Sequence, residues 1–275
     1  MDIKNKKHLG QNFLRDKNVL NDIIQAAEIK PSDPVLEIGP GKGVLTAALL
    51  QANAKVTAIE KDPQLVEFLQ KHLGNNPNLK IIQGDIRDFL KGENYKKYTL
   101  QNPEYKVVGN IPYYLTSYLL RLLLESPQQP SLIVLMIQKE VAQRIIAQPP
   151  KMNLLAVSVQ YYSKPGIIKI VPSQAFSPQP KVDSAIIKLI PIDTNANLKD
   201  LDKTLFFRVV NAGFSHPRKL LLNNLPYNFK IPKIKFQEIL EQMNLPLNTR
   251  AQNLSLQKWE NLTNKIASLF NKNIV

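Results

Sequence analysis

The 275-residue sequence contains no cysteine, which excludes disulfide bonds and thiolate metal sites. Long apolar segments are missing as well. The longest uninterrupted apolar run, Leu132–Ile137, is far shorter than the roughly 20 residues that span a bilayer. No apolar stretch follows the basic N-terminal segment, so a secretory signal is not expected. We therefore expect a soluble, cytoplasmic protein that does not insert into a membrane.

Acidic residues are scarce relative to basic ones: 22 Asp and Glu stand against 36 Lys and Arg, a formal net charge of +14. Such an excess favours polyanionic partners, meaning nucleic acid or an acidic membrane surface. A generally basic surface without a dedicated partner would give the same total. The 44% of hydrophobic residues is enough for a substantial globular core.

Short strands alternate with helices through the first two-thirds of the chain, which predicts βαβ units and a mostly parallel sheet. Two further strands, 167–171 and 182–190, flank a proline-bearing loop and should pair in antiparallel fashion at the sheet edge. The expected fold class is α/β, with a Rossmann-like, seven-stranded mixed sheet. The other predicted strands are 34–38, 55–60, 79–83, 105–109 and 132–138, and the predicted helices are 16–28, 44–51, 63–72, 117–124 and 139–147.

Beyond about residue 194 the strand patterns stop and only helices are expected, at 203–214, 219–225, 233–243 and 255–269. Residues 196–275 carry 12 basic and 5 acidic side chains, so positive charge is denser there than in the first 195 residues. The sequence therefore predicts two domains, 1–195 and 196–275. The second is suited to holding a polyanion.

A glycine-rich turn closes the strand at 34–38, where Glu37–Gly43 reads EIGPGKG. Glycine at position 39 would let a ligand approach the backbone at the carboxyl ends of the strands. The spacing matches neither the dinucleotide motif G-x-G-x-x-G nor the phosphate-binding P-loop. Alone, the cluster would fit a tight strand-to-helix turn equally well.

Two carboxylates at the next strand ends favour a ligand site. Glu60 can accept both ribose hydroxyls of an adenosine, and Asp85 can accept a hydrogen bond from an adenine amino group. Each alone would fit a solvated charge, but glycine, Glu and Asp at three successive strand ends resemble methyltransferases that bind S-adenosylmethionine. A nicotinamide-dependent dehydrogenase fits less well, because the turn spacing differs and no His or Tyr constellation for hydride transfer is evident.

The fourth strand leads into Val108–Tyr114, which reads VGNIPYY. The Asn110 oxygen and the Ile111 carbonyl can accept hydrogen bonds from an aromatic amino group and free its lone pair for attack on a methyl sulfonium. Tyr113 offers a face for an extruded base. Positioning can supply most of the rate, so no metal is required. The alternative is that Asn110 and Pro112 simply end the strand and the tyrosines pack in the core.

A second candidate contact is the loop Phe176–Ser184, which reads FSPQPKVDS. Phe176 can stack on the other face of the base, and Lys181 can reach a phosphate. From the residues alone, a rigid connection between two strands with Phe176 in the core is slightly favoured.

Together these segments resemble the KsgA (RsmA) family of small-subunit rRNA adenine N6,N6-dimethyltransferases, from about residue 4 to residue 262. The resemblance implies a class I methyltransferase sheet, S-adenosylmethionine as cofactor and no metal. It also implies dimethylation of two adjacent adenosines in the 3′-terminal hairpin loop of 16S rRNA within an immature small ribosomal subunit. We expect a monomer. The matching segments are 8–14 (HLGQNFL), 37–41 (EIGPG), 109–113 (GNIPY), 176–184 (FSPQPKVDS) and 223–225 (NNL).

The resemblance also implies which residues act. Residues 1–195 would form the catalytic domain and 196–275 the RNA-binding domain. The cofactor contacts would be Asn12, Leu14, Gly39, Glu60, Asp85 and Asn110. The catalytic and target-base residues would be Asn110, Pro112, Tyr113 and Phe176.

The sequence departs from the family pattern in Gly213–Leu220, where His216 and Pro217 replace a usually more basic stretch. Pro217 is expected to begin a helix, with Arg218 and Lys219 still available to RNA. Two other functions stay open. One is methylation of a 23S rRNA adenine of the macrolide-resistance type, and the other is a non-catalytic RNA-binding assembly or transcription factor on the same fold.

Overall fold

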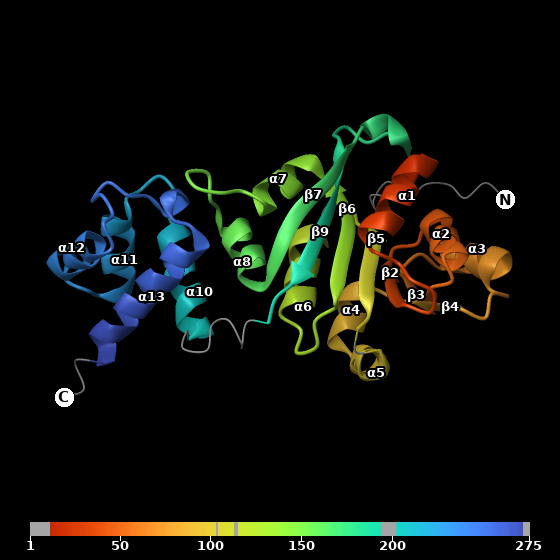
Figure 1. Ribbon diagram of the computed structural model, residues 1–275, viewed down its shortest axis with the longest axis horizontal. Coiled ribbons are helices and arrows are strands. Elements are labelled where there is room, and N and C mark those ends of the chain that lie inside the picture. Colours follow the sequence, from red (N-terminus) through yellow and green to blue (C-terminus); the bar gives the residue numbers. More distant parts are fainter. Residues whose placement is uncertain (1–11, 103, 113–114, 194–201, 272–275) are drawn as a thin grey trace. The chain divides into compact units, whose positions relative to one another are not determined.

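The computed structural model describes residues 12–102, 104–112, 115–193 and 202–271 (Figure 1). Contacts divide the chain into two compact units, one of residues 1–143 and 163–192 and the other of residues 144–162 and 193–275. The second unit thus contains residues 144–162 in addition to the C-terminal segment. In the described residues, no helix has both the length and the apolar character needed to cross a bilayer.

The first unit is built on a seven-stranded sheet with the order β4-β3-β2-β5-β6-β9-β7. The strands from β4 to β6 are parallel, whereas β9 is antiparallel to both β6 and β7. The predicted mixed sheet and its antiparallel edge are therefore confirmed. The strands are β2 (Pro34–Ile38), β3 (Lys55–Glu60), β4 (Leu79–Gln83), β5 (Lys106–Asn110), β6 (Leu132–Gln138), β7 (Ser163–Val171) and β9 (Ser184–Pro191).

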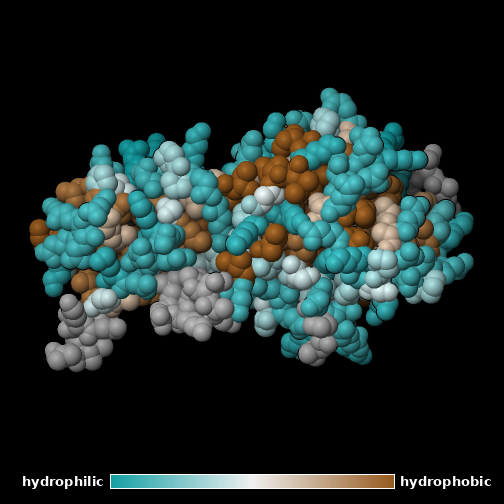
Figure 2. Space-filling model, in the orientation of Figure 1, coloured by the Kyte–Doolittle hydropathy of each residue, from teal (hydrophilic) through white to brown (hydrophobic). Residues whose placement is uncertain are grey.

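Helices cover this sheet, so the central strands are buried along their length. α1 and α2 pack on each other, α1 also contacts β6 and β7, and α3 lies against β3 and β4. Hydrophilic residues cover much of the visible surface, and hydrophobic ones appear over β7, where Ile168 and Ile170 are exposed (Figure 2). The helices are α1 (Lys17–Ala26), α2 (Val44–Gln51), α3 (Pro63–Leu73), α4 (Ile86–Lys91), α5 (Glu93–Gln101), α6 (Thr116–Leu124) and α7 (Lys139–Ile145).

Capping carboxylates set where three of these helices begin. Asp16, Asp62 and Asp85 have extended backbones, and each accepts a hydrogen bond from the backbone N–H two residues later. Such N-caps satisfy donors that the first helical turn leaves free. Each of the three therefore helps to fix where its helix starts.

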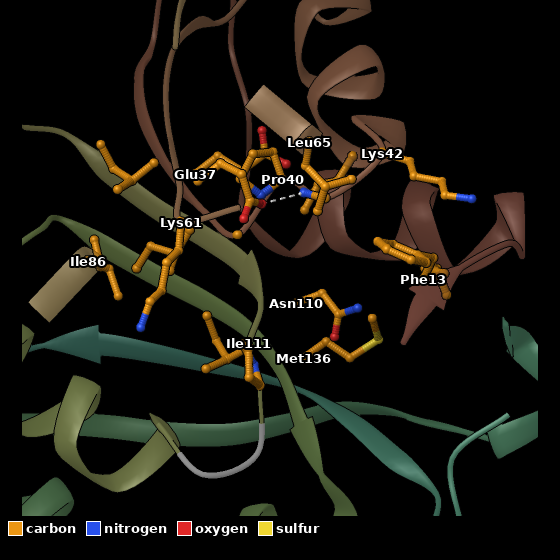
Figure 3. A pocket seen from close by; sticks show the side chains of 18 of the residues that line it. Phe13, Glu37, Pro40, Lys42, Lys61, Leu65, Ile86, Asn110, Ile111 and Met136 are labelled. Atoms are coloured by element: carbon orange, nitrogen blue, oxygen red, sulfur yellow. Dashed lines mark hydrogen bonds between the residues drawn. The ribbon is translucent and has the colours of Figure 1, made fainter. Parts of the chain in front are cut away.

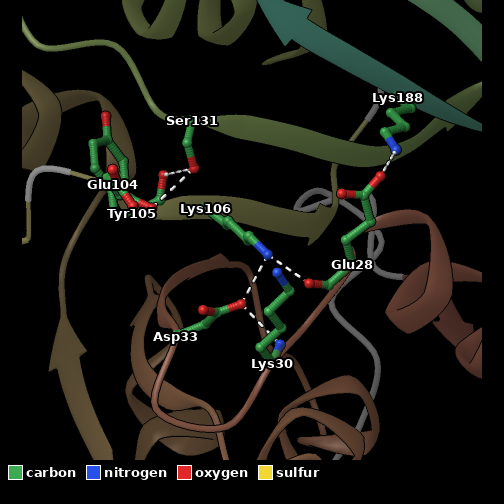
Figure 4. A network of polar contacts seen from close by, with 8 residues as sticks. All are labelled: Glu28, Lys30, Asp33, Glu104, Tyr105, Lys106, Ser131 and Lys188. Atoms are coloured by element: carbon green, nitrogen blue, oxygen red, sulfur yellow. Dashed lines mark hydrogen bonds and ion pairs between the residues drawn. The ribbon is translucent and has the colours of Figure 1, made fainter.

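A network of polar contacts holds the connection between α1 and β2 against the sheet (Figure 4). Lys106 of β5 donates to the Glu28 carbonyl at 2.6 Å and to the Asp33 carboxylate at 2.8 Å. Lys188 of β9 pairs with the Glu28 carboxylate at 2.6 Å. Because Lys106 and Asp33 are largely shielded from solvent, this pair is screened less than a surface ion pair.

The second unit is helical, with α8 (Leu154–Tyr162), α10 (Lys203–Phe214), α11 (Leu221–Phe229), α12 (Lys233–Gln242) and α13 (Leu256–Asn271). α10 packs against α8, α11 and α13 around the fully buried rings of Phe206 and Trp259. Residues 216–219 form a turn and α11 begins only at Leu221, so the prediction that Pro217 starts a helix is wrong. The chain reverses between α10 and α11 there, and Arg218 and Lys219 stay exposed.

α8 was not predicted from the sequence. Its residues, LLAVSVQYY, include apolar side chains on most of its circumference, and five of the nine are buried. A helix that is buried on several sides lacks the single apolar stripe on which periodicity depends.

Close packing of α10 on α13 explains a glycine inside a helix. A Cβ added at Gly213 would overlap the Trp259 ring. Alanine usually improves a helix interior by about 1 kcal/mol over glycine. Here the overlap with a buried ring opposes that gain.

We predict that Gly213→Ala lowers the free energy of unfolding, because overpacking costs about 1–3 kcal/mol and outweighs the gain in helix propensity. Denaturant titration followed by circular dichroism measures the change. In a Trp259→Leu background the same alanine should be neutral or stabilising. A more stable single variant would contradict this account of the packing.

Candidate active site

One pocket gathers most of the predicted site residues at the carboxyl ends of the parallel strands (Figure 3). Asn110, Ile111 and Met136 lie on one side, and Glu37, Pro40 and Leu65 lie on the opposite side. The short strand β1 (Phe13–Leu14) supplies another wall. The predicted residues that line this pocket are Asn12, Leu14, Gly39, Glu60, Asp85, Asn110 and Pro112.

The turn after β2 depends on glycine. Gly39, Gly41 and Gly43 have φ angles of +65°, +59° and +77°, in the left-handed region that L side chains rarely adopt. A Cβ at Gly41 would lie 3.0 Å from the Phe13 ring, so that glycine is also closely packed. At Gly39 the nearest atom would be the Asn110 carbonyl oxygen at 3.8 Å. Gly39 therefore leaves room for a ligand beside the backbone.

Glu60 ends β3 and supports the glycine turn. Its two carboxylate oxygens accept the backbone N–H groups of Gly41 at 3.1 Å and Asp62 at 2.9 Å. The side chain is almost fully buried, and this burial raises its pKa. Each carboxylate oxygen still has acceptor capacity, which suits vicinal hydroxyls of a ribose.

Asp85 is already engaged by two cations. It accepts two hydrogen bonds from the Arg87 guanidinium, at 2.9 and 2.6 Å, and one from Lys61 at 3.0 Å. The Arg87 guanidinium holds the pKa of Asp85 below its usual range, so the carboxylate is ionised at neutral pH. An adenine amino group would have to share this carboxylate with Arg87 and Lys61.

The orientation of the Asn110 amide is fixed by the N-terminal segment. Asn110 ends β5, and its Nδ2 donates to the backbone carbonyl of Asn12 at 2.9 Å. This hydrogen bond leaves the amide oxygen as the acceptor for a ligand. The next residue, Ile111, is buried and donates its N–H to the Met136 carbonyl at 3.1 Å, which anchors the start of the loop.

Of the predicted site residues that the structure describes, Phe176 lies outside this pocket lining. Tyr113 falls outside the described residues. Phe176 is only 4% exposed and packs in the same hydrophobic core as Leu14. It belongs to β8 (Phe176–Ser177), which pairs in antiparallel register with β1, Leu14 opposite Phe176. The pairing connects the Phe176 loop to the pocket wall through the backbone.

Sequence reasoning missed several residues of the site. Phe13 contacts Gly41, and the Lys42 ammonium lies 5.1 Å from the centre of its ring. Arg87 and Lys61 hold Asp85 in place. Glu37 was missed as well, and it is 1% exposed within β2. The sequence could have indicated Glu37, since it is a single acidic residue in the otherwise apolar strand PVLEI.

In the part of the chain that the structure describes, no cluster of three or more His, Cys, Asp or Glu could hold a metal ion. At the ends of β3, β4 and β5, Glu60, Asp85 and Asn110 instead offer hydrogen-bond acceptors to the pocket, which Lys42 and Lys61 also line. These acceptors suit an uncharged or cationic organic ligand with hydroxyl and amino donors.

Comparison with known proteins supports this interpretation. The family model described as ribosomal RNA adenine dimethylase matches residues 2–267. A relative from Crocosphaera subtropica, named ribosomal RNA small subunit methyltransferase A, is 42% identical, and the match covers 94% of this chain and 97% of the relative.

Two solved structures are similar over nearly the whole chain. A dimethyladenosine transferase from Plasmodium falciparum is 30% identical, with a TM-score of 0.75 and coverage of 96% of this chain and 98% of that one. The 23S rRNA methyltransferase ErmE is 27% identical, with a TM-score of 0.72 and coverage of 93% and 100%. The predicted class I methyltransferase fold and the predicted enzyme class are thereby confirmed. This chain belongs to the ribosomal RNA adenine dimethylase family.

Proposed function

We propose that this protein transfers methyl groups from S-adenosylmethionine to the N6 atoms of two adjacent adenosines in the 3′-terminal hairpin loop of 16S rRNA. Each adenosine receives two methyl groups in successive displacements. The protein would act as a cytoplasmic monomer on an immature small ribosomal subunit. The observation that carries the proposal is the orientation of Asn110 inside a pocket whose other acceptors suit an adenosine.

The pocket fits the proposed cofactor in its polar groups. Glu60 offers two buried carboxylate oxygens to ribose hydroxyls, and Asp85 offers an ionised carboxylate to the adenine amino group. Gly39 leaves space beside the backbone, where a side chain would fill the crevice. When bound, S-adenosylmethionine supplies an electrophilic methyl group on a sulfonium.

Asn110 acts on the target base. An adenine amino nitrogen is a weak nucleophile because its lone pair is delocalised into the ring. With Nδ2 held by the Asn12 carbonyl, the Asn110 oxygen accepts a hydrogen bond from the amino group and localises the lone pair. With S-adenosylmethionine bound, this nitrogen would be the nucleophile for its methyl group; the new bond to carbon would form as the carbon–sulfur bond breaks, and the surplus proton would pass to solvent. Positioning of this kind supplies much of the rate.

The other predicted residues have supporting parts in the proposal. The Ile111 carbonyl is a second acceptor for the amino group, and Pro112 shapes the pocket wall beside it. Tyr113 and Phe176 stack on the base; for Phe176 this requires that its buried ring becomes available when RNA binds.

We also propose that residues 1–195 form the catalytic domain and residues 196–275 bind RNA. The C-terminal segment has 12 basic and 5 acidic residues, and Arg218 and Lys219 are exposed in the turn before α11. Phosphate contacts from such residues would supply a large, salt-dependent part of the affinity.

The second candidate is methylation of a 23S rRNA adenine, which the similarity to ErmE favours. The higher identity to a protein named as a small-subunit methyltransferase argues for 16S rRNA. Both candidates use the same pocket, so they differ in the RNA that is recognised.

The substrate is tested by incubating the protein with labelled S-adenosylmethionine and either unmethylated small subunits or unmethylated large subunits. Mass spectrometry of RNA fragments then locates the modified nucleotides. We expect two adjacent N6,N6-dimethyladenosines in the 3′-terminal hairpin of 16S rRNA. Modification of 23S rRNA alone would favour the second candidate, and no modification of either would favour a non-catalytic RNA-binding factor.

Asn110→Ala should leave cofactor affinity within about threefold and reduce methyl transfer by at least about 100-fold, as expected when a positioned polar group of the reaction site is lost. Calorimetric titration measures the first quantity and single-turnover methyl transfer the second. The matched control is Asn102→Ala, because the Asn102 side chain donates a hydrogen bond to the Tyr98 carbonyl and does not line the pocket. A near-normal rate for Asn110→Ala would refute its role.

Asp85→Asn should weaken cofactor binding by about tenfold, or ~1.4 kcal/mol, because the site loses an ionised acceptor and the negative charge that Arg87 and Lys61 contact. Asparagine still caps α4, so the fold should be retained. Asp16→Asn is the control, since Asp16 caps α1 without lining the pocket. Equal affinity of the Asp85 variant and the native protein would contradict the adenine contact.

A further inference from the structure

A buried carboxyl group in the pocket wall has no assigned task. Glu37 lies in β2 between Leu36 and Ile38, and Figure 3 places it beside Pro40 in the pocket. Its side chain is 1% exposed, and neither carboxylate oxygen has a hydrogen-bond partner in the described structure. Native proteins seldom leave a buried polar group unpaired, because the desolvation cost is then uncompensated.

The immediate surroundings favour the neutral form of Glu37. Burial raises its pKa from 4.5 to about 8, and the charge of Glu60 adds to this increase. The Thr46 hydroxyl is near enough to Glu37 to oppose the increase, but the two groups do not meet the distance and angle of a hydrogen bond. At neutral pH the carboxyl group of the empty protein is therefore mostly protonated. A cation placed next to it would reverse that balance.

No cation of the described protein is available to Glu37. The charged groups that line the pocket with it are Lys42, Glu60, Lys61 and Asp85. Lys42 lies over the Phe13 ring, and Lys61 pairs with Asp85. Glu60 carries a negative charge when ionised and is bonded to backbone N–H groups of Gly41 and Asp62. Among the described residues no cation pairs with Glu37, so a bound cationic ligand would give it a charged partner.

Accepting the proposed function, we propose that Glu37 is the counter-carboxylate for a cationic group at the methionine end of S-adenosylmethionine, and that it releases its proton to solvent when this cofactor binds. Two groups of the cofactor are cationic, the sulfonium and the α-ammonium. The product S-adenosylhomocysteine keeps only the ammonium. Cofactor binding is therefore coupled to proton release, and the Glu37 charge exists mainly in the complex.

The proposal predicts a pH dependence of affinity with a definite sign. If binding expels one proton, affinity for S-adenosylmethionine rises about tenfold per pH unit below the pKa of Glu37 in the empty protein. Titrations between about pH 6 and about pH 7 keep the cofactor ammonium protonated, because free α-amino groups titrate near ~8. The Glu60 carboxyl group faces the same pocket, so it must be tested separately.

The experiment is calorimetric titration of the full chain with S-adenosylmethionine in buffers that differ in ionisation enthalpy. The native protein should release close to one proton per cofactor near pH ~6. Glu37→Gln should bind several-fold more weakly at neutral pH, release no proton and lose the pH dependence. Glu37→Asp keeps a carboxyl group and should keep the release, and Glu60→Gln should bind more weakly but still release the proton.

A parallel titration with S-adenosylhomocysteine identifies the cationic partner. Proton release with both ligands assigns the ammonium, and release with S-adenosylmethionine alone assigns the sulfonium. Either result supports the proposal. Binding without proton release, or release that persists in Glu37→Gln and vanishes in Glu60→Gln, overturns it and leaves the proposed function intact. Absence of any binding would overturn both.

Stability of the empty protein gives a second readout that does not require cofactor. Between pH 4.5 and about pH 8 the folded chain keeps the Glu37 proton that the unfolded chain releases, since burial raises the pKa of Glu37 over this interval. The stability that Glu37 contributes therefore declines as pH rises through this window. Glu37→Gln should fold and show a shallower decline in melting temperature. An unchanged slope would contradict the buried, protonated state.

Discussion

The site depends on the register of three parallel strands. Ile38 of β2 lies opposite Ile59 of β3 and Gly109 of β5, so the residues that follow them, Gly39, Glu60 and Asn110, emerge at one edge of the sheet. A slip of one residue would turn every side chain of a strand to the opposite face. Helices on the sheet make the strand interiors apolar and fix this register. The ends of the strands are then free to carry polar groups.

That constraint explains how much could be predicted. Glycine, Glu60, Asp85 and Asn110 occur at recognisable strand ends, and parallel strands bring such ends together, so local patterns were enough to predict that these residues line one pocket. The pairing of β1 with β8 could not be predicted from local patterns, because the two strands are far apart in the chain and each contributes only two residues. α8 was not predicted because apolar residues lie on most of its circumference, so its sequence shows no alternation of an apolar and a polar face. Glu37 was not predicted as a site residue because the strand was recognised by its apolar residues. That its carboxyl group is unpaired is visible only in the three-dimensional structure.

The N-terminal segment links the two halves of the proposed chemistry. The Asn12 carbonyl orients Asn110, Phe13 packs on Gly41, and Leu14 pairs with Phe176. The wall of the pocket proposed to hold the cofactor is therefore continuous with the loop proposed to contact the target base. Phe176 is buried in the structure, so its proposed contact with the base requires a local rearrangement near β1. Such a rearrangement would act on the Asn110 amide as well, because Asn12, which holds that amide, directly precedes the strand that pairs with Phe176.

The central claim is that an adenosine-based methyl donor binds at the strand ends, and a crystal structure of the protein with S-adenosylhomocysteine tests it most directly. We expect ligand density in the crevice bounded by Gly39, Glu60 and Asp85, with the amino-acid portion of the ligand near Glu37 and Asn110. Density elsewhere on the molecule, or an empty crevice at saturating ligand, would contradict it.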